Sequence, residues 1–111
     1  MDKIERYRSI LQTVMQEYAS PKPAHGDIRL SPMVDPTNDH YGVLMAGWNG
    51  EERIEGIVIH IDIIDGKVWI QYDGTAPGIA LDLVDAGIPH EDIVLGFHPP
   101  EVRQHTDFAL G

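Results

Sequence analysis

Residues 53–63 read Arg-Ile-Glu-Gly-Ile-Val-Ile-His-Ile-Asp-Ile, and this stretch decides the fold. Isoleucine occupies every second position from Ile57 to Ile63, an alternation typical of a β-strand with one buried face. The other face carries smaller or polar side chains: Gly56, Val58, His60 and Asp62. The stretch therefore predicts a strand whose all-isoleucine face is covered by another element.

Tight-turn dipeptides stand on both sides of this strand. Asn49-Gly50 precedes it and Asp65-Gly66 follows it, and both pairs favour two-residue hairpin turns. Beyond them, residues 41–48 and 67–72 have the composition of strands. Turns this short join neighbouring antiparallel strands, so the three segments are predicted to form a meander.

A fourth strand is predicted over residues 27–35, where Pro32 indicates a sheet edge or a bulge because proline donates no ladder hydrogen bond. A helix precedes it and is predicted to end at Ser20-Pro21-Lys22-Pro23, since proline cannot continue a helix. Its apolar stripe consists of Ile4, Tyr7, Leu11, Val14 and Tyr18. This stripe is expected to dock on the sheet.

The pattern changes to short helices after the fourth strand segment. One helix is predicted to begin after Thr75, with Pro77 in its first turn and Gly87 as its C-terminal cap. A second helical turn is expected from Pro89. Regular structure is expected to end at residues 97–100.

The tail is predicted to be irregular, with Val102 and Phe108 as anchors. The whole chain, residues 1–111, is predicted to be one α+β domain. Its N-terminal helix packs on a four-stranded, largely antiparallel sheet, and short helices follow.

Charge narrows the classes of function. The chain has eight Lys and Arg against eighteen Asp and Glu. Residues 1–29 carry five basic and four acidic side chains, whereas residues 30–111 carry three and fourteen. Phosphate backbones are bound mainly by Lys and Arg, so this composition does not favour direct nucleic-acid binding. The acidic composition would complement a basic surface on a protein partner, although an acidic surface also keeps a protein soluble without any partner.

Other properties of the sequence exclude several classes of protein and of functional site. The chain contains no cysteine, which rules out disulfides, thiolate zinc sites and thiol nucleophiles. No apolar run approaches the roughly 20 residues of a membrane helix, and the amphipathic start does not resemble a secretory signal. A cytoplasmic protein is expected.

Catalytic and cofactor motifs are weak. His60 and Asp62 lie on one strand face and could supply two metal ligands, with a third from Asp39, His40 or His98. Nothing in the sequence selects the third, and a solvated His–Asp pair explains the pattern equally, so no metal site is assigned. Neither nucleotide-binding glycine pattern is present, and no spacing selects a pair of catalytic carboxylates. The expectation is a protein without cofactor or enzymatic activity.

Two tryptophans point to a binding surface. Trp48 and Trp69 lie opposite the apolar faces of their strands, and tryptophan is enriched at binding hot spots. The candidate protein-binding residues are Trp48, His60, Asp62, Trp69 and Gln71. The alternative is that the short helices or the tail cover this face, which makes the tryptophans part of a core.

Several motifs together resemble the XisI family, the cyanobacterial fdxN element excision controlling factors. They are His40-Tyr41, Gly47-Trp48, His60-x-Asp62, Gly66-Lys67-x-Trp69-Ile70-Gln71, Asp73-x-Thr75 and the run from Gly87 to Pro100 with Arg103. The opening helix and the closing Thr106-x-Phe108-Ala109 extend the resemblance over essentially the whole chain. Ala76 departs from the family pattern, which usually has an acidic residue there.

The resemblance implies an accessory role in programmed DNA excision by a site-specific recombinase. It implies contact with a companion factor, XisH, and provides no catalytic residues. A DNA-binding recombination directionality factor and a metal-dependent enzyme using His60 and Asp62 are the alternatives, and a homo-oligomer stays open.

Overall fold

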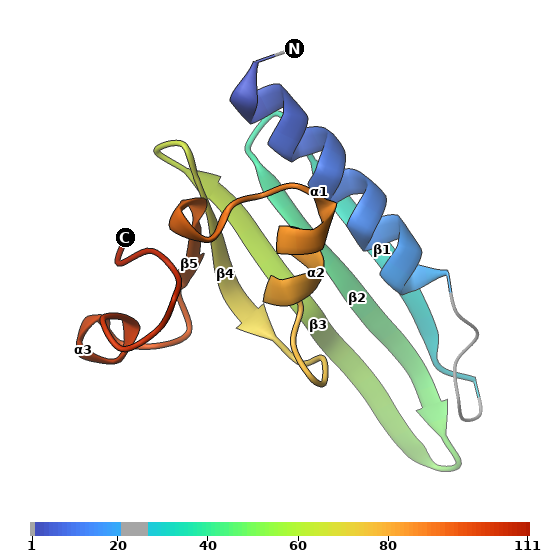
Figure 1. Cartoon of the computed structure of the whole chain (residues 1–111). Helices are drawn as coiled ribbons and strands as arrows, with labels where there is room; N and C mark the ends of the chain where they lie inside the picture. The colour runs from blue at the N-terminus through green and yellow to red at the C-terminus, as the bar shows by residue number, and fades with distance from the viewer. Residues whose placement is uncertain (1, 21–26) are drawn as a thin grey trace.

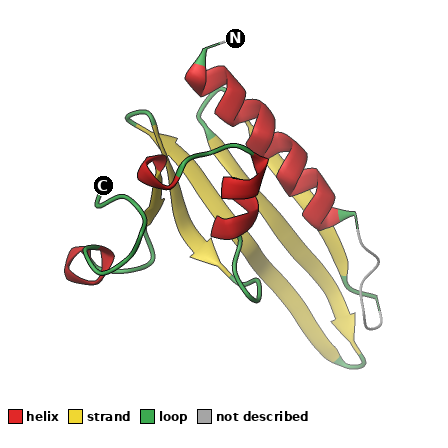
Figure 2. Ribbon diagram, viewed as in Figure 1, coloured by secondary structure: helices red, strands yellow, loops and turns green. Residues whose placement is uncertain are grey.

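A computed structural model describes residues 2–20 and 27–111 of the chain. Helices α1 and α2 lie over the same face of a twisted sheet (Figures 1 and 2). The elements in chain order are α1 (Lys3–Ala19), β1 (Arg29–Asp35), β2 (His40–Asn49), β3 (Glu52–Ile64), β4 (Lys67–Asp73), α2 (Ala80–Ala86), a 3₁₀ turn (His90–Asp92), β5 (Ile93–Leu95) and α3 (Pro100–Arg103). The predicted α+β architecture is confirmed, with one strand more than expected.

Helix α1 buries the stripe that its sequence pattern predicts. Tyr7, Leu11 and Val14 are buried together with Met15, while Ile4 and Tyr18 pack at the margin of the core. Asp2 caps the helix by accepting a hydrogen bond from the Glu5 backbone N–H, and Ser20 is the C-terminal cap. The predicted stop at residues 21–23 lies outside the described residues. The core lies between the two helices and the isoleucine-rich sheet face.

The predicted meander is also confirmed. Strands β1 to β4 pair antiparallel in chain order, and β1, which contains Pro32, is an edge strand. Asp65 and Gly66 both have positive φ, 50° and 81°, as a two-residue turn of the mirror-image type requires.

A β-bulge at Val58 corrects one prediction. Val43 pairs with Ile59, but its neighbour Leu44 pairs with Ile57, so β3 holds one residue more than β2. The bulge reverses the alternation, and Ile57 lies on the opposite face from Ile59, 42% exposed. The prediction that Ile57 belongs to the covered face is therefore wrong.

The predicted four-stranded sheet gains a fifth strand. Ile93–Leu95 pairs parallel with β4 after the chain crosses over the helix side of the sheet (Figure 1). A run of three apolar residues is too short to show a period, so the sequence pattern did not separate it from the helical turn before it.

Helix α2 begins later than predicted, at Ala80 instead of directly after Thr75. The Asp73 carboxylate accepts hydrogen bonds from the backbone N–H groups of Thr75 and Ile79, which holds the intervening segment as a turn. The C-terminal cap is as predicted, because Gly87 has a φ of 119°.

The C-terminal segment, residues 96–111, contains the short helix α3, where no regular structure was expected. Phe108 packs against the core as predicted, whereas Val102 is exposed and does not anchor the tail. Ala109 joins the sheet edge through a bridge to Val94. Among the described residues, no helix has the length and apolar character needed to cross a membrane.

Candidate functional site

The sheet has an open face, defined here as the face turned away from α1 and α2. Exposed apolar side chains gather on it because the alternation that buries Val43, Ile59 and Ile61 directs their neighbours outward. They are Leu44, Trp48, Ile57, Ile64 and Tyr72. A sheet face with this many exposed apolar side chains is typical of an interaction surface.

The C-terminal segment covers one end of the open face. The Arg103 guanidinium lies 5.1 Å from the centre of the Trp69 ring, and Lys67 Nζ donates to the Gly111 carbonyl over 2.8 Å. Val94, the register partner of Trp69, is completely buried although it lies outside the main core. The tail therefore shields Trp69 in part, as the alternative interpretation of the sequence foresaw for this tryptophan.

Where β2 begins, two imidazole rings on the open face converge on one carboxylate. His40 Nδ1 lies 2.7 Å and His60 Nε2 lies 3.0 Å from the same atom, Asp62 Oδ1. His40 and Asp62 are register partners on β2 and β3, and His60 stands two residues from Asp62 on the same side of β3. We call His40, His60 and Asp62 the His–Asp–His cluster.

The surroundings hold this carboxylate in place. Gln71 Nε2 donates to Asp62 Oδ2 over 3.3 Å, so both carboxylate oxygens are engaged. Asp62 is only 9% exposed, while the His40 side chain is about half exposed. The hydrogen bond that the His40 ring donates to Asp62 raises the pKa of His40, because the carboxylate favours the protonated ring.

Four of the five predicted site residues lie together. His60, Asp62 and Gln71 are in contact, and Trp69 is the register partner of Asp62 on β4. Trp48 does not join them: it lies eight residues beyond His40 along β2, a separation of about 26 Å at the rise of a strand.

The structure also selects a third member for the histidine–aspartate pair. It is His40, one of the three candidates. Asp39 instead accepts two hydrogen bonds from Arg8, and the His98 ring packs at a tilt against the Phe97 ring near the tail. The bulge at Val58 is what brings His40 opposite Asp62.

The far end of the β2–β3 hairpin is a second feature of the open face. The hairpin extends beyond α2 (Figure 1), and Trp48 near its tip is 49% exposed, with the Arg53 guanidinium 5.4 Å from its ring. Four residues before Trp48 on β2, about 13 Å away at the rise of a strand, Leu44 pairs with Ile57. These two residues line a shallow groove with Met45, Ala46, Glu55 and Gly56.

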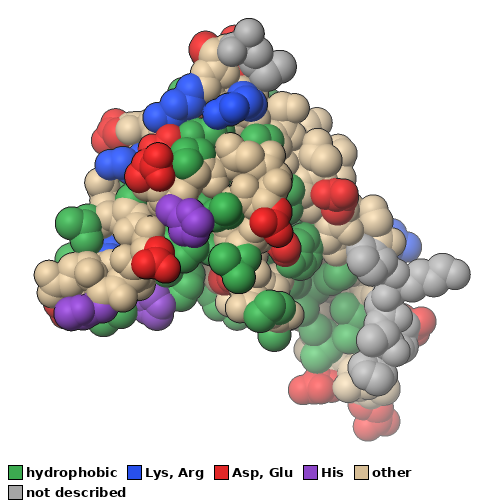
Figure 3. Space-filling model, in the orientation of Figure 1, with side chains coloured by type: hydrophobic (Ala, Val, Ile, Leu, Met, Phe, Trp, Pro, Cys, Tyr) green, Lys and Arg blue, Asp and Glu red, His purple; other side chains and the backbone are tan. Residues whose placement is uncertain are grey.

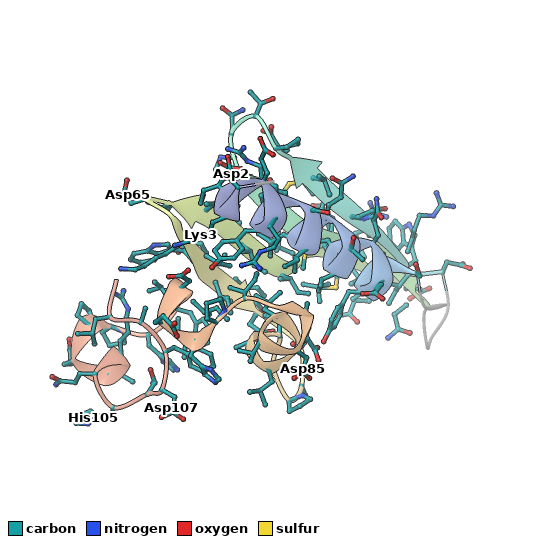
Figure 4. All side chains as sticks on the ribbon, turned by 45° about the horizontal axis from the view of Figure 1, so that its top comes forward. Asp2, Lys3, Asp65, Asp85, His105 and Asp107 are labelled. Carbon is teal, nitrogen blue, oxygen red and sulfur yellow. The ribbon has the colours of Figure 1, made fainter. Side chains whose placement is uncertain are left out.

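The basic residues of α1 are largely engaged within the molecule. Basic side chains gather at the N-terminal end of this helix (Figure 3), and Figure 4 shows Lys3 there. Lys3 Nζ lies 2.9 Å from an Asp92 carboxylate oxygen, and Arg8 binds both carboxylate oxygens of Asp39. Two of the basic side chains described in this region, Lys3 and Arg8, are therefore paired with carboxylates within the molecule.

Comparisons with known proteins agree with this architecture. The family model described as XisI protein matches residues 1–110. A XisI-like protein from Anabaena variabilis is 37% identical, with a TM-score of 0.89 over 97% of this chain and 99% of its own. The fdxN element excision controlling factor XisI from the same organism is 35% identical, with a TM-score of 0.82 over 99% and 100%. No curated protein matches the chain. The chain belongs to the XisI family.

Proposed function

We propose that the chain controls excision of a DNA element by binding a companion protein, a XisH-like factor with a basic surface, and not by catalysis. The family match and the controlling-factor name of a similar protein support the role in excision. The observation that carries the binding mode is the open sheet face, where Trp48 is exposed near the hairpin tip and Leu44 and Ile57 are exposed farther along the same hairpin.

The chemistry of this surface favours a protein partner. Apolar groups surrounded by acidic side chains attract a surface with an apolar centre and a basic rim. Tryptophan is among the residues most enriched at binding hot spots, and Trp48 is about half exposed on this surface. Acidic Glu51, Glu52 and Glu55 lie on the same hairpin, so the hairpin end combines both properties.

Direct DNA binding fits the same surface poorly. A phosphate backbone requires several free cations, but the chain carries a formal charge of −10. Lys3 and Arg8 are paired with carboxylates, and Arg53 lies over the Trp48 ring. Any contact with the DNA element is assigned in this proposal to the companion or to the recombinase.

The test is co-purification with a XisH-like protein from the same genome, followed by titration calorimetry. Trp48→Ala is expected to weaken the complex by at least 30-fold, about 2 kcal/mol at a hot spot. Leu81→Ala is the matched control, because Leu81 is an exposed apolar residue on α2, on the helix side.

Two outcomes would contradict the proposal. One is the absence of any complex between the two purified proteins. The other is a complex that Leu81→Ala weakens and Trp48→Ala does not. A mobility-shift assay at about 0.15 M salt, where screening is already strong, serves as the comparison for DNA. Binding of the chain alone to the excision site there would favour the directionality-factor alternative.

A further inference from the structure

We infer that His40, His60 and Asp62 form a binding site for a divalent transition-metal ion, with Zn²⁺ as the ion it is best suited to. The ligand atoms would be His40 Nδ1, His60 Nε2 and Asp62 Oδ1, which all lie within 4.8 Å of one another. Two imidazole nitrogens and one carboxylate oxygen make up a common set of three protein ligands in open zinc sites.

The distances fit an ion with little rearrangement. Ligand atoms bound to tetrahedral zinc at about 2.1 Å lie about 3.4 Å from one another. The two ring nitrogens are already 2.7 Å and 3.0 Å from Asp62 Oδ1. To reach that spacing, the two nitrogen–oxygen distances must lengthen by about 0.7 Å and about 0.4 Å, which small rotations of the side chains supply.

The backbone holds the three ligands in place. His40 and Asp62 face each other across the β2–β3 ladder, and His60 is on the same strand as Asp62. No ligand comes from a loop, so the strand pairing fixes their separation before any ion binds. Preformed ligands of this kind reduce the entropy that binding must overcome.

Gln71 supplies a supporting contact. Its Nε2 donates to Asp62 Oδ2, which leaves Oδ1 as the oxygen that faces the two rings. Outer contacts of this type orient a ligating carboxylate and commonly change metal affinity by about 10- to 100-fold. The role of Gln71 here is positioning, not ligation.

The ligand atoms determine which ions the site prefers, and the exposure of His40 determines whether water can reach the bound ion. Imidazole nitrogens favour zinc, copper, nickel and iron over magnesium and calcium, which prefer all-oxygen sites. The His40 side chain is about half exposed, so the remaining coordination position is open to water.

The experiment uses tag-free protein stripped of metal with a chelator and titrated with Zn²⁺ by calorimetry, and with Co²⁺ by visible absorption. One equivalent of Zn²⁺ is expected to bind, and Co²⁺ is expected to develop the intense bands of a low-coordinate site. His40→Gln and His60→Gln each abolish this binding, and Gln71→Ala weakens it by about 10- to 100-fold.

His105→Gln is the matched control, because His105 is an exposed histidine on the C-terminal segment, where Figure 4 labels it. This variant is expected to bind Zn²⁺ as the natural chain does. His40 is half exposed, so His40→Gln keeps the test valid even if changes at buried Asp62 unfold the protein.

Failure to bind one equivalent of Zn²⁺ would overturn the inference, as would binding that survives both His40→Gln and His60→Gln. If Mg²⁺ bound with the same affinity as Zn²⁺ in the calorimetric titration, the assignment to a transition metal would be overturned. All measurements use the chain alone, so their outcome is independent of whether Trp48 binds a companion protein.

Discussion

Asp39 shows how a single residue joins the helix to the sheet. Its carboxylate accepts hydrogen bonds from Arg8 Nε over 2.8 Å and from Arg8 Nη2 over 3.1 Å, and the Tyr41 hydroxyl donates to it as well. Its backbone has a φ of 57°, a conformation that aspartate tolerates better than most residues. The paired Arg8 guanidinium lowers the pKa of Asp39 below its usual value.

This pair predicts an acid-sensitive contribution to stability. Because the folded pKa of Asp39 is depressed, the contribution is complete above the unfolded value of about 4. It disappears as the pH falls through the lower folded pKa. Arg8→Met is therefore expected to reduce the free energy of unfolding at pH 7, and the deficit is expected to shrink as the pH approaches 3. Urea unfolding at both pH values measures the effect.

Arg6→Met is the control, since the Arg6 guanidinium lies 5.7 Å from the Tyr7 ring centre and is not among the salt bridges of the described residues. Arg6→Met is expected to change the free energy of unfolding by the same small amount at both pH values. A deficit for Arg8→Met that is as large at pH 3 as at pH 7 would show that its effect is packing alone.

The residues of the candidate site were predictable in part. The alternation on β3 places His60 and Asp62 on one face from sequence alone. His40 could not be selected from the three candidates, because a two-residue turn at Asn49-Gly50 would pair it with Ile59. In the structure Asn49 pairs with Glu52 and the turn residues are Gly50 and Glu51, a register that pairs His40 with Ile61 in the absence of a bulge. The bulge at Val58 shifts this register by one residue and pairs His40 with Asp62. No glycine marks the bulge at Val58, so the sequence offers no local sign of it.

At the level of elements, one side chain, Arg103, links the two ends of the C-terminal segment. Arg103 Nε donates to the His98 carbonyl and Nη1 donates to the Leu110 carbonyl, so Arg103 joins both ends of the segment. Its guanidinium also lies over Trp69. The tail thus depends on Arg103 for its position on the open face.

Arg103→Ala is expected to loosen this segment and to cost about 2 kcal/mol of stability, the usual range for lost charge-assisted hydrogen bonds. Hydrogen exchange should increase first at the Ala109 N–H, which donates to the Ile93 carbonyl over 2.8 Å. Mass-spectrometric exchange and urea unfolding measure the two effects.

Arg53→Ala provides the comparison, because Arg53 also lies over a tryptophan but joins no distant segments. It should leave exchange at Ala109 unchanged. Equal exchange in the natural chain and in Arg103→Ala would show that the Phe108 contact alone holds the tail.

The longer elements follow from local sequence, whereas the short ones depend on tertiary contacts. The stripe of α1 and the Asp65-Gly66 turn carry enough periodicity and turn chemistry to be predicted directly, whereas the turn predicted at Asn49-Gly50 lies one residue later, at Gly50-Glu51. Strand β5 has three residues and is ordered by pairing with β4, and α3 has four residues and follows Pro99. Periodicity needs more residues than either element contains.

Across the whole molecule, charge is distributed unevenly. The formal charge is −10, and several acidic side chains lie at the surface, including Asp85 on α2 and Asp107 on the tail (Figure 4). Like charges at this density repel one another in the folded state more than in the expanded unfolded chain. Family membership points to the control of DNA-element excision, and this charge is the reason why we propose a protein, and not DNA, as the direct contact of the chain.

The repulsion predicts that salt stabilises the protein. Raising NaCl from about 0.01 M to about 0.15 M shortens the screening length from about 30 Å to about 8 Å. The melting temperature is therefore expected to rise over this range, which differential scanning calorimetry measures. Asp85→Lys with Asp107→Lys brings the formal charge from −10 to −6 and should reduce the increase. A melting temperature that falls with salt would mean that attractive pairs such as Arg8–Asp39 outweigh the net repulsion.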